Sequence, residues 1–154
     1  MKKLCLCLAV VFSLTLLMNV CAFASPYSLT GNEQSTSDSL LYIKKPASRT
    51  ATTSEKTYTV SAVGKPGVDV TVYRKSAYDG NFYRVFQKGY MLESKIGASG
   101  VYVVSIELLE GGNKMIVYAE NNVERQIIKI DITRLSKNQL DKIKALSIGD
   151  LFSY

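Results

Sequence analysis

Apolar and polar residues alternate along most of this chain, and a period of two residues predicts β-strands that bury one face. The alternation runs through residues 57–63, 68–73, 101–108, 114–119 and 128–132. The inner face that it defines includes Val60, Val70, Val72, Val104, Ile106, Val117 and Ile130. Turn residues separate these short segments, so the pattern predicts an all-β fold, an antiparallel β-sandwich of two sheets.

The first part of this pattern also predicts how neighbouring strands connect. Gly64-Lys65-Pro66-Gly67 is a turn sequence between two alternating segments, which predicts a two-strand hairpin. Residues 40–46 form a short strand that ends at Pro46, and a proline at that position favours the edge of a sheet because it donates no hydrogen bond. Residues 47–55 are expected to form a loop.

The period changes near the end of the chain, within residues 134–154. Ser136 and Gln139 have the spacing of a capping box, and Leu140, Ile143 and Leu146 follow on one stripe. These residues predict a short amphipathic helix, which would cover the outward-facing Ile116 and Tyr118. A frayed tail is the alternative, because helices this short are marginal without packing.

Residues 1–24 have the features of a signal peptide. Lys2 and Lys3 precede an apolar run, and Ala22-Phe23-Ala24 is a small-x-small cleavage site. We therefore expect a secreted, extracellular protein that begins at Ser25 and has lost all three cysteines, Cys5, Cys7 and Cys21. An uncleaved anchor and lipidation at Cys21 are the alternatives. Loss of two lysines would lower the formal net charge from +6 to +4.

The mature chain is expected to begin with a flexible linker over residues 25–39. This segment is rich in Ser, Thr, Gly, Asn and Gln, and its only sizeable apolar side chains are Tyr27 and Leu29. Two such side chains are too few to offset the entropy of ordering fifteen residues.

Several motifs between Leu40 and Thr133 occur in the order found in bacterial immunoglobulin-like domains, and this region resembles that family. The motifs are Tyr42-Ile43-Lys44-Lys45-Pro46, Gly64-Lys65-Pro66-Gly67 followed by alternating valines, Gly100-Val101-Tyr102-Val103-Val104, and Leu108-Leu109-Glu110-Gly111-Gly112-Asn113. The resemblance implies an immunoglobulin-like β-sandwich over residues 40–133. It also implies a non-catalytic spacer or adhesion module of secreted and cell-surface proteins, and it carries over no catalytic residue.

The segment from Arg74 to Ile96 departs from this pattern because it is longer and rich in aromatic and basic residues. Exposed rings beside cations can stack on sugars or on an apolar patch of a partner. The candidate ligand-binding residues are Phe82, Arg84, Phe86, Lys88 and Tyr90. The alternative is that these rings pair across strands and fill the core.

The mature chain has no histidine and no cysteine, so we do not expect an enzyme, a cofactor or a metal site. The alternative function is a small carbohydrate-active enzyme or inhibitor with a carboxylate site near the aromatic segment. Loops 79–81 and 120–122 carry oxygen ligands for calcium, although turns favour the same residues. The expected partner is a cell-wall or extracellular glycan, or a surface protein. Nucleic acid is not expected, nor is a membrane after cleavage, and the oligomeric state is open.

Overall fold

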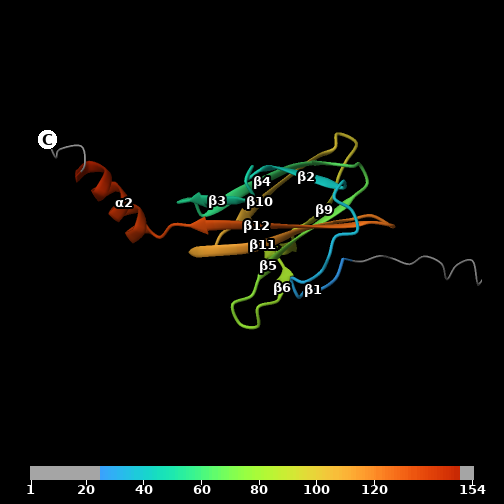
Figure 1. The fold of residues 1–154 in the computed structure, drawn as a ribbon, viewed down its shortest axis with the longest axis horizontal. Coiled ribbons are helices and arrows are strands. Elements are labelled where there is room, and N and C mark those ends of the chain that lie inside the picture. The colour runs from blue at the N-terminus through green and yellow to red at the C-terminus, as the bar shows by residue number, and fades with distance from the viewer. Residues whose placement is uncertain (1–24, 150–154) are drawn as a thin grey trace, which may run out of the picture.

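The structure, a computed structural model, describes residues 25–149, with side chains described up to residue 145. The predicted signal peptide, residues 1–24, lies outside this range. Twelve strands and one helix are present in the described part of the chain, and the strands form three sheets (Figure 1). The fold is therefore all-β with a helix at its C-terminal end.

The largest sheet has the strand order β1-β6-β5-β11-β12-β3, and β9 also pairs with β5. Its strands are β1 (Ser28–Leu29), β3 (Thr50–Thr53), β5 (Asp69–Lys75), β6 (Phe82–Arg84), β9 (Glu93–Lys95), β11 (Gly111–Glu120) and β12 (Arg125–Arg134). All these neighbours are antiparallel except β12 and β3, which are parallel.

The second sheet has three antiparallel strands in the order β10-β4-β2, which are β10 (Val101–Glu107), β4 (Thr57–Gly64) and β2 (Leu41–Lys45). Its β2 strand is at the edge, as Pro46 predicts. A separate two-stranded hairpin consists of β7 (Phe86–Gln87) and β8 (Tyr90–Met91).

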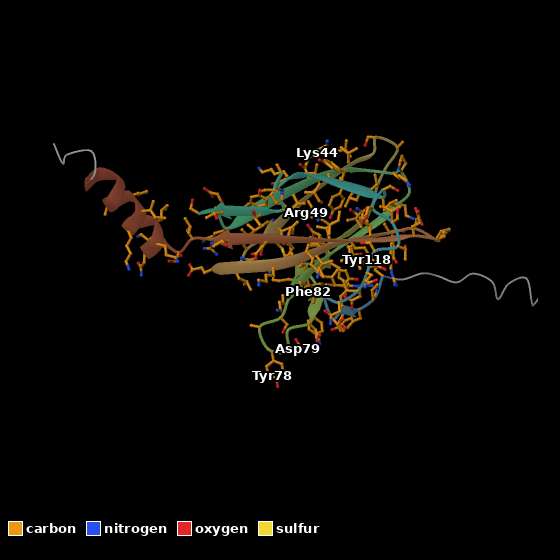
Figure 2. All side chains as sticks on the ribbon, in the orientation of Figure 1. Lys44, Arg49, Tyr78, Asp79, Phe82 and Tyr118 are labelled. Atoms are coloured by element: carbon orange, nitrogen blue, oxygen red, sulfur yellow. The ribbon has the colours of Figure 1, made fainter. Side chains whose placement is uncertain are left out.

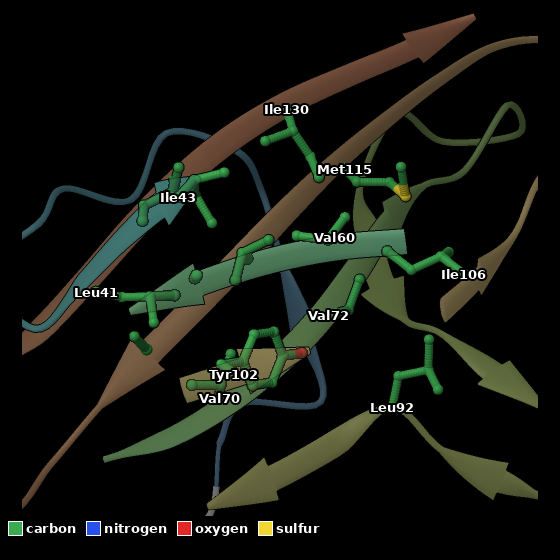
Figure 3. Packing of buried hydrophobic residues seen from close by; sticks show 14 of the residues in the cluster. Leu41, Ile43, Val60, Val70, Val72, Leu92, Tyr102, Ile106, Met115 and Ile130 are labelled. Carbon is green, nitrogen blue, oxygen red and sulfur yellow. The ribbon is translucent and has the colours of Figure 1, made fainter. Parts of the chain in front are cut away.

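The main hydrophobic core lies between the large sheet and the three-stranded sheet (Figure 3). The alternating residues predicted to face inward do so: six of the seven are buried, and Val104 is partly buried against the same cluster. The buried six are Val60, Val70, Val72, Ile106, Val117 and Ile130. The period of two thus identified the inner faces correctly.

Two of the predicted connections are wrong. The strands before and after Gly64–Gly67 belong to different sheets, so this turn links the two layers and closes no hairpin. Alternation identifies the inner face of a strand but not its hydrogen-bonded neighbour. The expected loop 47–55 contains β3, whose polar residues pair with β12 at the margin of the large sheet.

The expected linker is also wrong, because residues 25–39, the N-terminal segment, are packed on the large sheet: residues 25–31 lie on its outer face, and residues 35–37 bond along the edge of β12. On the outer face, Leu29 joins Tyr73, Phe82, Ile116 and Tyr118 in a second cluster of buried residues. The Oγ atom of Ser35 accepts a hydrogen bond from the Ile127 N–H, and Thr36 exchanges bonds with the backbone of Arg125. The burial of Leu29 and the hydrogen bonds of Ser35 and Thr36 therefore order a segment whose composition resembles that of a linker.

Helix α2 (Lys137–Gly149) begins with the predicted capping box. The Ser136 N–H donates to Gln139 Oε1 over 3.0 Å, and the Gln139 N–H donates to Ser136 Oγ over 3.3 Å. However, the helix points away from the sheets and Ile143 is exposed (Figure 1). It does not cover Ile116 and Tyr118, because the N-terminal segment does so. Within the described residues, no helix is long and apolar enough to cross a membrane.

We expect Ile106→Ala to lower the free energy of unfolding by about 2–5 kcal/mol, through lost burial and a cavity between the sheets. Val103→Ala, on the same strand but facing outward, is the matched control and should change stability by less than about 0.5 kcal/mol. Urea titration measures both values. Equal effects of the two substitutions would show that the faces of β10 are wrongly assigned.

Leu29→Ala tests the N-terminal segment. Because Leu29 is buried on the large sheet, its truncation should cost about 2–5 kcal/mol in urea titration, whereas a linker residue would cost almost nothing. Gln34→Ala in the same segment changes an exposed side chain and serves as the control. A Leu29→Ala protein as stable as the control would contradict the packed arrangement.

Candidate functional site

The structure divides the five candidate ligand-binding residues into two groups. Phe82 lies on the outer side of the large sheet, buried beneath the N-terminal segment (Figure 2). A Cβ atom added to Gly31, whose φ is 86°, would lie only 2.8 Å from the Phe82 ring. Phe82 is therefore a core residue and cannot contribute to an exposed platform.

Arg84 also has a structural role, because its side chain is mostly buried and is bonded within the protein. Its side chain is only 16% exposed, its Nε donates to the Pro26 carbonyl over 3.1 Å, and its Nη1 pairs with Glu93 over 3.2 Å. The same carbonyl accepts a bond from the Tyr73 hydroxyl, and burial raises the pKa of Tyr73 to about 12, so this donor stays protonated. Arg84 thus holds the N-terminal segment in place.

The other three candidates belong to the β7–β8 hairpin. Lys88 and Gly89 form its two-residue turn with φ values of 52° and 89°, which are the positive values of a type I′ turn. Phe86 is 65% exposed and Tyr90 is 57% exposed. Since Phe86 pairs with Met91 and Gln87 with Tyr90, the two rings lie on opposite faces of the hairpin. They therefore do not form one aromatic platform.

Gln87 connects this hairpin to the three-stranded sheet. Its Nε2 donates to the Ser105 carbonyl over 2.8 Å, and its Oε1 accepts from the Glu107 N–H over 2.9 Å. The side-chain amide of Gln87 therefore makes, at the end of β10, the two hydrogen bonds that the backbone of a neighbouring strand would make. Sequence reasoning missed this role, because an isolated glutamine has no distinctive spacing.

The rest of the outer edge of β10 is open. The Leu108 N–H bonds to Lys56 on the β4 side, so the backbone groups of the odd-numbered residues point away from β4. Among residues 25–149, no hydrogen bond reaches the N–H or the C=O of Val103, or the N–H of Ser105. An open edge of this kind can pair with another strand.

A groove of about 310 Å³ runs beside this edge. Residues 102–105 form one wall, and the hairpin and β9 form the other, with Lys88, Tyr90 and Glu93 at its sides. On the outer face of the same sheet, Tyr42, Val63 and Val101 are exposed and lie in register as one apolar row. The open edge thus combines backbone hydrogen-bonding groups with exposed apolar side chains.

Glu93 and Asp79, the carboxylates near the aromatic segment, have separate partners and do not face one another as a catalytic pair. Glu93 pairs with Arg84, and a hydrogen bond from Tyr83 lowers the pKa of Asp79 to about 2, which keeps Asp79 ionised rather than able to act as an acid. The two loops that carry oxygen ligands use these oxygens locally: Asp79 accepts bonds from Asn81, and Asn121 Oδ1 accepts from the N–H groups of Val123 and Glu124. No cluster of three metal-ligating side chains occurs among the described residues.

A larger hollow, of about 540 Å³, lies beside the β10–β11 turn and is lined by Arg74, Lys75 and Lys114. Arg74 is already bonded to the Glu107 carbonyl, and Arg134 bonds to the Leu108 carbonyl. Asn113 completes the turn, because the two N–H groups of its Nδ2 are shared among three carbonyls, those of Leu109, Gly111 and Ile132. These polar groups are already bonded within the protein and stabilise the turn. The groove at β10, whose backbone groups are open, is therefore the better candidate site.

A comparison with models of known protein families finds no match for this chain, and a comparison with curated proteins finds none either.

The aromatic candidates can be separated by their thermal midpoints. Phe82→Ala should lose about 3–5 kcal/mol because the ring is buried, whereas Phe86→Ala and Tyr90→Ala should each lose less than about 1 kcal/mol. Differential scanning calorimetry of the three variants measures these losses. Large drops in the Phe86 and Tyr90 variants would mean that the hairpin belongs to the core.

Proposed function

We propose that this chain is a secreted, non-catalytic immunoglobulin-like module that binds a protein partner at the bacterial cell surface by adding a strand of the partner to β10. The observation that carries this proposal is the open edge of β10 beside the β7–β8 hairpin. Strand addition is a general mode of peptide recognition in which main-chain bonds give affinity and side-chain pockets give specificity.

The strand order supports the immunoglobulin-like part of the proposal. In chain order, β2, β4 and β10 match strands A, B and E of one immunoglobulin sheet, and β5, β11 and β12 match strands C, F and G of the other. The short β3 runs beside β12 after the chain leaves the first sheet at Pro46. The chain has no tryptophan and its cysteines all precede Ser25, so the core is built without the disulfide and the tryptophan of antibody domains.

The groove has suitable dimensions for an extended peptide. Its β10 wall covers four residues, and a strand of that length spans about 13 Å. The bonds that Gln87 makes show which backbone groups a partner strand could use further along the edge. A strand added there would also continue the apolar row across the sheet, so it should carry an apolar side chain on that face.

Val103→Pro tests strand addition, because it removes an outward N–H while leaving the bonds to β4 intact. Val103→Thr is the matched control, since it changes the same exposed side chain and retains the N–H. Surface proteins and purified wall glycans, each immobilised separately, serve as the bound phase in a pull-down with the mature chain. We expect capture by surface protein that Val103→Pro reduces at least tenfold and Val103→Thr does not.

Two results would count against this proposal. Capture by glycan that depends on Tyr90 but not on the Val103 N–H would assign the groove to a sugar. Capture by neither material would contradict a binding role. A thermal melt of each variant verifies that a loss of capture does not reflect unfolding.

A further inference from the structure

Ser25, the first residue after the predicted cleavage site, is part of the folded structure. Its side chain and backbone are together only 6% exposed. Its Oγ donates to Glu120 Oε1 over 2.5 Å and accepts from the Thr71 hydroxyl over 3.0 Å. The next residue is equally fixed, because the Pro26 carbonyl accepts from Tyr73 and from Arg84. The position of the Ser25 backbone is therefore set by three strands of the large sheet.

Covalent geometry then places the Ser25 nitrogen near a carboxylate. Within one serine the nitrogen lies no more than about 4 Å from Oγ, so it lies within about 6.5 Å of Glu120 Oε1, since Oγ is 2.5 Å from that oxygen. The other oxygen of Glu120 accepts a bond from the Tyr118 hydroxyl over 3.0 Å, which orients the carboxylate.

Glu120 differs from the other acidic groups of this region because it makes no salt bridge among the described residues, although Arg125 lies opposite it in the ladder. Glu93 pairs with Arg84, and Asp69 pairs with Lys95 over 3.0 Å. Among the described residues, no lysine or arginine nitrogen lies within 4 Å of the Glu120 carboxylate. Because Glu120 is half-buried, a positive charge beside it would be screened less than at the open surface.

We propose that cleavage of the Ala24–Ser25 bond creates the missing cation, an α-ammonium at Ser25 that pairs with Glu120 and fastens the N-terminal segment to the large sheet. Water is the co-reactant: the amide C–N bond breaks, Ala24 leaves as a carboxylate, and Ser25 takes the amine with its protons. In an uncleaved chain the same nitrogen is a neutral amide. The inference rests on the secretion that is part of the proposed function, but not on any ligand.

The pairing predicts how stability depends on pH. An unfolded α-amino group has a pKa of about 7.7–8.0, and a neighbouring carboxylate raises the pKa of the folded group. The added stability is therefore fully present below about pH 7.7 and is lost as the pH rises through the raised value. The other titratable or charged groups around the site are Arg84, Arg125, Glu93, Asp69, Lys95, Tyr73 and Tyr118.

The test compares three forms of the mature chain: one that begins with a free amine at Ser25, one acetylated at Ser25, and one that retains Ala24. At pH 6.5 and low salt, the free-amine form should melt about 3–6 °C above the other two. The advantage should shrink at pH 10. It should also disappear in Glu120→Gln, but persist in Glu124→Gln, which removes a nearby, partly exposed carboxylate that pairs with Lys65 instead.

Equal melting temperatures of the three forms at pH 6.5, or an advantage that survives Glu120→Gln, would overturn the ion pair. The pH series uses the unsubstituted chain, so the test stands even if Glu120→Gln fails to fold. Intact mass of protein from the medium should correspond to a chain that begins at Ser25. A start elsewhere, or a lipid on Cys21, refutes the inference on processing, whereas the capture experiments with β10 variants test the binding function separately.

Discussion

The large sheet is apolar on both faces, and this property determines the rest of the structure. In β5 and β11, Val72 and Val117 face the three-stranded sheet, whereas Tyr73, Ile116 and Tyr118 face the other way. A single facing sheet covers only one of these surfaces. Leaving the other in water would cost roughly 1.5–3 kcal/mol for each large apolar side chain. A third layer is therefore needed, and the N-terminal segment supplies it.

Because of this third layer, part of the aromatic segment is buried and is not available for binding. Phe82 and Arg84 were candidates for an exposed platform, but one ring fills the outer cluster and the guanidinium binds the Pro26 carbonyl. Only the β7–β8 hairpin remains free of the core. Because Gln87 ties that hairpin to β10, the surface available for binding moves from an aromatic patch to the edge of a sheet.

The sequence predicts the inner faces, the edge position of β2 and the capping box of α2, since each depends on local spacing. It does not predict which strands pair. A turn such as Gly64–Gly67 has the same residues whether it closes a hairpin or connects two different sheets. Nor does the sequence predict the order in residues 25–39. Composition counts Leu29 as one apolar residue among many polar ones, whereas its stabilising effect depends on the outward-facing rings of Tyr73, Phe82 and Tyr118 with which it packs.

The edges of the two main sheets are protected to different degrees. The β2 edge ends at Pro46, and Lys44 and Lys45 lie over the rings of Tyr42 and Tyr58 at 4.4 and 5.3 Å. The β3 edge is short and polar. Charges, prolines and short polar strands are the usual means by which proteins prevent edge pairing. In contrast, β10 presents exposed Val101 and Val103 and is covered only at one end, by a single glutamine. That asymmetry favours a partner for β10, since an edge that only needed protection could have been blocked by the same means as the edges at β2 and β3.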